Sequence, residues 1–276
     1  MRYQRFFCLF FCLSIGLFSD QWSGTDYAKN SSVQLSHAEH LLSKLSLQGD
    51  ESILDIGCGD GKITALLANK VPFGKVVGID PSSSMLKKAK DTYEENHLTF
   101  YEGSAENFFL DEQFDHVVAI HVMHWIKEQK IALQNICRHI KPQGHIHLVL
   151  APSKEGLPFY KALLKMVDIW KEDFIGFINP QQVFDMETYR KLMIEAGFHV
   201  EAIHYLHHES IHENKKKLQA WIEQWLPHGK YLPEEKRSLF FTELLRNYLL
   251  EMQASPDTVD KVSWSEYVLI VEGKKI

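Results

Sequence analysis

Cysteine is scarce in this 276-residue chain. The four present, Cys8, Cys12, Cys58 and Cys137, form neither a Cys-x-x-Cys pair nor a Cys/His zinc spacing. This argues against a disulfide framework and against a structural zinc site. The 15 histidines include no His-Glu-x-x-His sequence, so we expect no metal to be bound.

A long block of basic residues is also absent. Lys and Arg total 30 against 36 Asp and Glu, which gives a formal net charge of −6. Proteins that bind duplex nucleic acid usually carry clustered positive charge facing the phosphates. The sequence therefore predicts no nucleic-acid partner. The content of apolar residues, 45%, is typical of a globular protein with a sizeable core.

The N-terminal apolar run, residues 6–18, is too short for a confident membrane span, which needs about 20 residues. It follows Arg2 and Arg5, as in a secretory signal, but residues 14–20 offer only poor signal cleavage sites. Three interpretations of residues 1–20 stay open: an export signal, a short anchor giving weak membrane association, or an extension from a mis-chosen start codon.

Short apolar strands alternate with amphipathic helices through the first half of the chain. The first helix is expected from Ser31 or Ser32 to near Gly49, and another over residues 132–140 that stops at residues 141–144. This rhythm predicts an α/β fold with a doubly wound, mainly parallel sheet. The strands are expected at residues 52–56, 75–80, 98–101, 115–120 and 145–150.

The rhythm changes after about residue 151. Helices are predicted at residues 157–170 and 186–196, an extended segment at 198–211, and a final strand at 265–271. We therefore expect a core at residues 27–151, followed by sheet completion and a helical lid over the substrate at residues 152–276. The lid is helical over residues 218–252, broken at Pro227 and Pro233, and carries the aromatic residues Trp221, Trp225, Tyr231, Phe240, Phe241 and Tyr248.

A glycine loop follows the first predicted strand, in the pattern Asp55-x-Gly57-x-Gly59-x-Gly61. Glycines at such a strand end let backbone N–H groups approach a ligand closely. Lys62 stands where a dinucleotide site would have its third glycine, and the acidic loop is unfavourable for a diphosphate. Asp80, at the end of the next strand, is placed to bind ribose hydroxyls.

A nucleoside with positive charge and no phosphate fits this loop best, and S-adenosylmethionine has that description. Its ammonium group can face Asp55, and its ribose Asp80. Met85 and the turn of residues 104–106 can enclose adenine. The residues expected to bind the cofactor are Asp55, Gly57, Gly59, Asp60, Asp80, Met85, Ser104, Ala105, Glu106, Ile120 and His121.

Four segments carry a family resemblance: ILDIGCGDGKIT, VVGIDPSSSML, FDHVVAIHVMHWI and a helix ending IKPQGH. Over about residues 30–150 they resemble the Rossmann-like class I S-adenosylmethionine-dependent methyltransferases. Residues 27–34, His124-Trp125 and the segment LPEEKR are similar to trans-aconitate and juvenile hormone acid methyltransferases. That resemblance implies a small carboxylic acid as substrate. Many members have Asp where this chain has Ser104, so Glu106 or backbone groups are expected to contact adenine instead.

The resemblance also implies the residues that hold the acceptor. Gln34 and Trp125 would donate hydrogen bonds to its carboxylate, which is ionised at pH 7 and needs no general base. His121 and His124 lie at the same strand end, and either could instead be a base for a hydroxyl or thiol acceptor. A lipid- or protein-linked acceptor and a non-catalytic nucleoside-binding module are further alternatives, with a nicotinamide-dependent oxidoreductase last. The cofactor favours a cytoplasmic location.

Overall fold

The computed structural model describes residues 32–152 and 157–276, whose strands form one seven-stranded sheet in the order β3-β2-β1-β4-β5-β7-β6. The predictions for residues 1–20 and for residues 27–31 lie outside this part of the chain. The strands are β1 (Ser52–Ile56), β2 (Lys75–Asp80), β3 (Leu98–Glu102), β4 (Phe114–Ile120), β5 (Ile140–Leu150), β6 (Phe198–His212) and β7 (Val262–Lys275).

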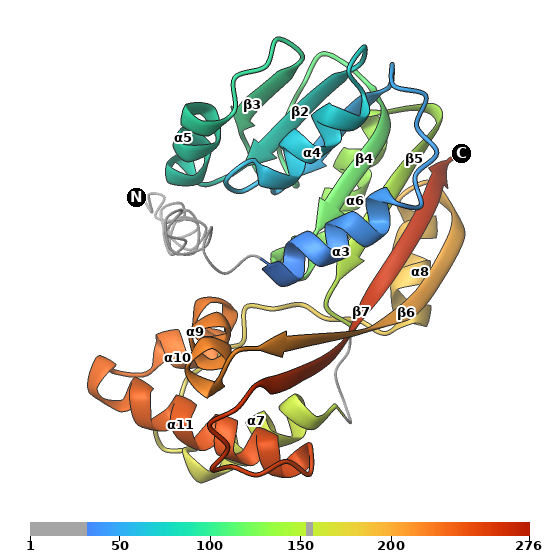
Figure 1. Ribbon diagram of the computed structural model, residues 1–276. Helices are drawn as coiled ribbons and strands as arrows, with labels where there is room; N and C mark the ends of the chain where they lie inside the picture. The colour runs from blue at the N-terminus through green and yellow to red at the C-terminus, as the bar shows by residue number, and fades with distance from the viewer. Residues whose placement is uncertain (1–31, 153–156) are drawn as a thin grey trace, which may run out of the picture.

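The first five strands are parallel, whereas β7 lies antiparallel between β5 and β6. The central strands β1, β2 and β4 are buried over most of their length, as expected for parallel strands covered on both faces. The doubly wound, mainly parallel α/β sheet predicted from the sequence is thus confirmed. The carboxyl ends of β1 to β4 lie along one edge of the sheet (Figure 1).

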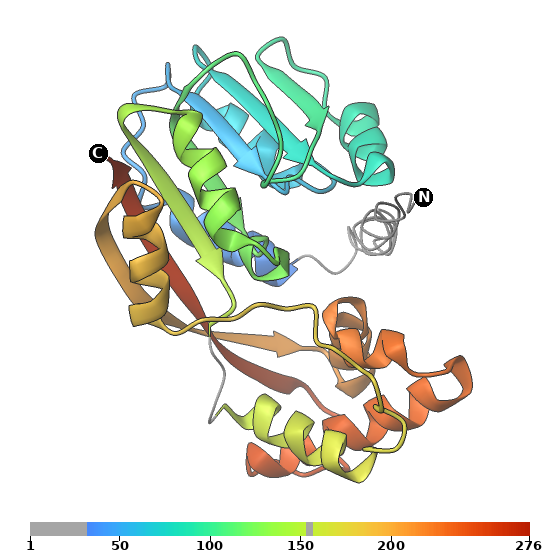
Figure 2. The same ribbon diagram turned by 180° about the vertical axis from the view of Figure 1, so that it is seen from behind.

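Helices cover both faces of this sheet (Figures 1 and 2). The apolar side chains of α3, α4 and α5 form one core with the strands, and those of α6 and α8 form another on the opposite face. Pairs such as Ala38 with Leu41 and Leu133 with Ile136 follow the three-residue spacing of amphipathic helices. The helices are α3 (Ser32–Leu42), α4 (Lys62–Lys70), α5 (Ser83–Thr92), α6 (Gln129–Arg138) and α8 (Met186–Glu195).

Strands β6 and β7 continue beyond the other strands into a helical region, shown in the lower half of Figure 1. This region has an apolar core of its own, which includes Phe159, Leu218, Phe240, Tyr248 and Trp264. Its helices are α7 (Pro158–Ile169), α9 (Lys215–Trp225), α10 (Pro227–Tyr231) and α11 (Glu234–Glu251). In residues 32–152 and 157–276, no helix combines the length and hydrophobicity that crossing a membrane requires.

The sequence-based boundaries differ most from the structure at two places, and the strand expected at residues 265–271 is longer, Val262–Lys275. The helix expected to end near Gly49 ends at Leu42. Residues 141–144, expected to stop a helix, belong to β5, because α6 already ends at Arg138. The exposed Pro142 fits into this strand because the pairing of β4 with β5 is irregular there: Phe114 pairs with Ile140, but His116 pairs with His145.

Candidate active site

The glycine loop after β1 is folded back onto the end of β2. The backbone N–H groups of Gly57 and Cys58 both donate to the carbonyl oxygen of Ile79, at 2.7 and 2.9 Å. Gly57 has φ 71°, and a Cβ there would lie 2.3 Å from Val122, which follows β4. Gly59 has φ 55°, but a Cβ would meet no atom within 4 Å. The backbone of Gly59 therefore borders open space that a ligand can enter.

Asp80 joins the loops that follow β1 and β2. Its carboxylate accepts hydrogen bonds from the backbone N–H groups of Gly59, at 3.0 Å, and Ser82, at 2.8 Å. Its carbonyl oxygen accepts from the N–H of Gly103, beyond β3, at 3.1 Å. Burial raises the pKa of the Asp80 carboxyl, although these two N–H groups oppose that shift. One residue thus fixes the relative positions of three strand ends.

The other two acidic residues of the loop have different surroundings. Asp55 is buried, and its carboxylate accepts a hydrogen bond from the hydroxyl of Thr64 at 2.8 Å. Burial, with a smaller effect from Asp80, raises the pKa of Asp55 to about 7. Asp60 faces helix α5, with its carboxylate 3.8 Å from the ammonium of Lys88. At neutral pH, Asp55 is therefore only partly ionised, and a nearby cation would favour its charged form.

The predicted adenine-binding residues follow β3 and begin α5. Ser104 donates its hydroxyl hydrogen to the Asn107 side chain, and Ala105 is buried. Met85 is also buried, in the first turn of α5. Sequence analysis missed Asn135 of α6, whose side-chain amide donates to the carbonyls of Ala105 and Phe108 at 3.2 and 3.0 Å. Asn135 therefore fixes the turn that contains Glu106.

The end of β4 holds a strained residue. Ile120 is the last residue of the strand, and His121 next to it has φ 58°, in the left-handed region that residues other than glycine seldom adopt. This conformation costs about 1–3 kcal/mol and is often found at functional sites. The backbone N–H of His121 donates to Val149 at 2.7 Å, and its ring Nε2 lies 2.8 Å from Nδ1 of His37.

The four residues predicted to act on the acceptor all line one pocket. Gln34 of α3 lines it together with His121, His124 and Trp125. His124 and Trp125 belong to the short helix η1 (Met123–Trp125), directly after β4. The opposite wall is aromatic and comes from the helical region and β7, with Phe159, Tyr160, Trp221, Trp225, Trp264 and Tyr267.

The aromatic residues predicted to cover the acceptor divide into two groups. Trp221 and Trp225 line the pocket. Phe240, Phe241 and Tyr248 instead fill the core of the helical region, and Tyr231 is partly exposed, donating its hydroxyl hydrogen to Ile175. Trp264 and Glu266 also line the pocket, and sequence analysis missed them because they lie far from the glycine loop in the chain.

Several polar atoms in this pocket wall are buried without a hydrogen-bond partner. They include the indole nitrogens of Trp221 and Trp264 and the amide oxygen of Gln34. An unsatisfied buried polar group costs about 1–3 kcal/mol. Because indole N–H groups can only donate, they favour a ligand with acceptor oxygen atoms, whereas the amide oxygen of Gln34 needs a hydrogen-bond donor.

Among the described residues, one group of histidine and acidic side chains is close enough to share a metal ion. It consists of His37 of α3, His208 of β6 and Glu266 of β7, whose ligand atoms all lie within 4.8 Å of one another. Sequence analysis gave no metal site, because these three residues are separated in the chain and form no motif.

Comparisons with known proteins agree with this arrangement. Residues 54–148 match the family model of a methyltransferase domain. The chain is 28% identical over 227 residues to protein 235L of Invertebrate iridescent virus 6, a match covering 82% of this chain and 85% of the viral one. It is 26% identical over 239 residues to juvenile hormone acid O-methyltransferase of Drosophila melanogaster, covering 81% and 80% of the two chains.

A third relative is trans-aconitate 2-methyltransferase of Shigella flexneri, 23% identical over 229 residues, covering 80% of this chain and 86% of that protein. Among solved structures, mycolic acid cyclopropane synthase complexed with S-adenosylhomocysteine has the same fold, with a TM-score of 0.59 and 16% identity over 88% of this chain and 84% of that one. The sequence pattern, the family match and these relatives together indicate that residues 54–148 form a class I S-adenosylmethionine-dependent methyltransferase domain, and the solved structure has the same fold.

Proposed function

We propose that this methyltransferase O-methylates a small carboxylic acid. The observation that carries the proposal is the pocket wall, where the indole N–H groups of Trp221 and Trp264 are buried and without partners. An ionised carboxylate only accepts hydrogen bonds, so it matches such donors. The names of two relatives, juvenile hormone acid O-methyltransferase and trans-aconitate 2-methyltransferase, also specify an acid as acceptor.

The cofactor would lie against the glycine loop. Gly59 leaves open space for its approach, and Asp80, at the end of β2, would hold the ribose. Asp55 would face the ammonium group, with Gly57, Asp60, Met85, Ser104, Ala105, Glu106, Ile120 and His121 around the rest. S-adenosylmethionine supplies a methyl group that its sulfonium already activates for displacement, so the protein has mainly to align the acceptor and exclude water.

Gln34, Trp125 and His124 would orient the acceptor. The ring Nδ1 of His124 accepts a hydrogen bond from the backbone N–H of Ala151 at 3.2 Å. In the neutral ring the proton then lies on Nε2, which makes that nitrogen a donor. This tautomer suits a carboxylate acceptor better than it suits a hydroxyl or thiol, which would need His124 as a base.

The experiment that tests this function is a screen with methyl-labelled cofactor against carboxylic acids, phenols, alcohols and thiols. We expect labelled methyl esters from a subset of apolar acids and no product from the other classes. Transfer to a phenol or thiol, rising with pH as a general base loses its proton, would contradict the proposal and favour His121 or His124 as that base.

Replacing Asp80 by alanine should weaken the binding of S-adenosylhomocysteine. Loss of a charged hydrogen-bond acceptor costs about 2 kcal/mol, or roughly 30-fold in the dissociation constant. Isothermal titration calorimetry measures it. Asp111→Ala, an exposed change in a loop, is the control, and Trp125→Phe should keep this affinity but slow turnover. Equal affinity in Asp80→Ala and the parent protein would remove the ribose assignment.

Cofactor binding should release protons near pH 6. The pKa of Asp55 is about 7 in the folded protein, so below pH 7 this carboxyl is largely protonated. A bound cation favours the ionised form, so the affinity for S-adenosylmethionine should rise up to about tenfold per pH unit as the pH approaches 7.

Calorimetry at pH 6 in buffers of different ionisation enthalpy counts the protons released, and we expect a number approaching one per chain. Asp55→Asn keeps an oxygen to accept the hydrogen bond from Thr64 but cannot titrate, so it should release none. A release that is the same in this variant and the parent protein would show that another group loses the proton.

Trp264→Phe should raise the KM for the acid acceptor by about tenfold, because it removes an indole donor worth about 1–1.5 kcal/mol and keeps most of the aromatic surface. The affinity for S-adenosylhomocysteine should stay unchanged. Trp170→Phe is the matched control, since Trp170 lies outside the pocket and donates its indole N–H to the carboxylate of Glu243. If both variants have the parent KM, the indole of Trp264 does not bind the acceptor.

A further inference from the structure

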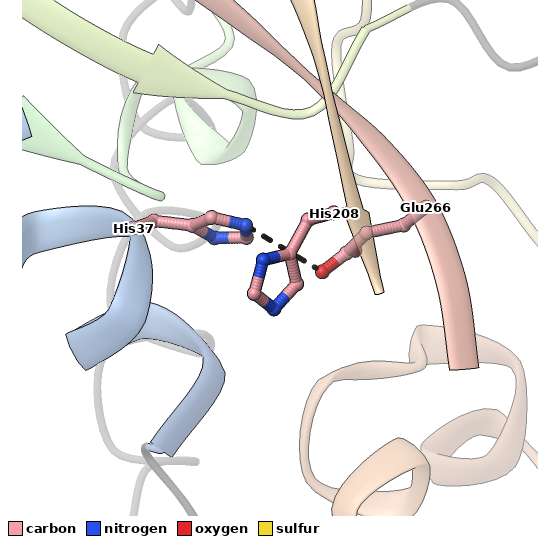
Figure 3. A group of neighbouring side chains, drawn as sticks. All are labelled: His37, His208 and Glu266. Carbon is pink, nitrogen blue, oxygen red and sulfur yellow. Dashed lines mark ion pairs between the residues drawn. The ribbon is translucent and has the colours of Figure 1, made fainter. Parts of the chain in front are cut away.

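Strands β6 and β7 place a histidine and a glutamate side by side. His208 and Glu266 are directly opposite each other in the antiparallel register, so their side chains lie on the same face of the sheet. His37 reaches toward this pair from α3 (Figure 3). Nε2 of His37 and Oε1 of Glu266 are 4.0 Å apart, which is too long for a hydrogen bond. Three elements thus converge on one small space.

His37 has an unusual environment for a polar residue. Its side chain is only 1% exposed, yet its Nε2, which faces Glu266, is buried without a hydrogen-bond partner. Its other ring nitrogen, Nδ1, lies 2.8 Å from Nε2 of His121. Histidines that ligate metals typically use one ring nitrogen for the metal and hydrogen-bond the other, which fixes the ring. His37 has this arrangement.

Burial favours the uncharged form of His37 and of His208. Burial lowers the pKa of His37 to about 2, with further effects from His121, His208 and His40. Burial also lowers the pKa of His208, assisted by His207 and His40. A neutral imidazole offers a lone pair, which is the form that binds metals.

We propose that His37, His208 and Glu266 bind a divalent transition-metal ion of the zinc class. Two imidazole nitrogens and a carboxylate oxygen are ligands that zinc accepts, with bonds of about 2.0–2.2 Å. In a tetrahedral site with such bonds the ligand atoms lie about 3.4 Å apart, so Nε2 of His37 and Oε1 of Glu266, now 4.0 Å apart, would come closer by less than 1 Å when the ion binds. Three protein ligands leave a position open for water or another ligand, as in catalytic zinc sites.

Because Glu266 lies in the acceptor pocket, a metal ion bound to it would also help to bind the acceptor. This second step rests on the proposed function. Glu266 also lines the acceptor pocket, and the described residues of that lining include no lysine or arginine. An ionised Glu266 would repel a carboxylate acceptor. A divalent cation on Glu266 reverses the local charge and would attract it.

The test uses the full-length protein, stripped of metal with a chelator and titrated with Zn²⁺ by calorimetry and with Co²⁺ by visible absorption. We expect one ion per chain and cobalt absorption bands of a site with nitrogen and oxygen ligands. His208→Gln and Glu266→Gln should each weaken binding by at least about tenfold, since even residues that only support a metal ligand cost 10–100-fold. His207→Gln is the matched control, because His207 precedes His208 on the same strand and points to the other face.

Binding of S-adenosylhomocysteine, measured on each variant, checks that the protein remains folded. If no ion binds, or if one binds equally well to the parent protein and both ligand variants, the metal site is excluded. Metal binding is measured without a methyl acceptor, so the result is independent of the acid screen. A protein that binds the metal but methylates no acid would contradict the proposed function and leave the metal site in place.

Discussion

The carboxylate of Asp80 is the constraint on which the candidate site depends. It accepts the N–H of Gly59 from one loop and that of Ser82 from the next, and the Asp80 carbonyl accepts the N–H of Gly103 from a third. Parallel strands end at a common edge, but their loops have no fixed relation unless some group joins them. Asp80 provides that group here, and the backbone of Gly59 consequently faces open space at a fixed place.

The second half of the chain supplies the aromatic side of the pocket, next to the carboxyl ends of the parallel strands. β6 and β7 are long enough to belong both to the sheet and to the helical region, so they hold the two parts together. Trp264 and Glu266 lie on the part of β7 that passes the end of the parallel strands, and they face Gln34 and Trp125 across one pocket. The glycine loop therefore belongs to the first half of the chain, whereas the pocket is lined by residues of both halves.

The sequence predicted the parallel sheet and which residues gather around the glycine loop, because the evidence there is local. Asp55, Gly57, Gly59 and Asp80 lie within two successive strand and loop units, so their spacing alone brings them together. The part of the pocket wall that Trp264 and Glu266 form could not be predicted in the same way. The positions of these two residues depend on the pairing of β6 with β7, which are separated by about 50 residues, and no periodicity reveals which residues become opposite. Asn135 was missed for a similar reason, since it acts by contacting backbone carbonyls of a distant turn.

The pairing of β6 with β7 also limits where the chain can accept insertions and deletions. Side chains alternate along a strand, so deleting Ser265, which lies between Trp264 and Glu266, would turn the Trp264 indole away from the pocket while Glu266 kept its place opposite His208. A deletion between Glu266 and the sheet would displace both together. Insertions and deletions are tolerated far more easily in the helices between the two strands, where the register is unaffected. Relatives with different acceptors should accordingly differ most in the size of that helical segment and least in the length of the strands on either side.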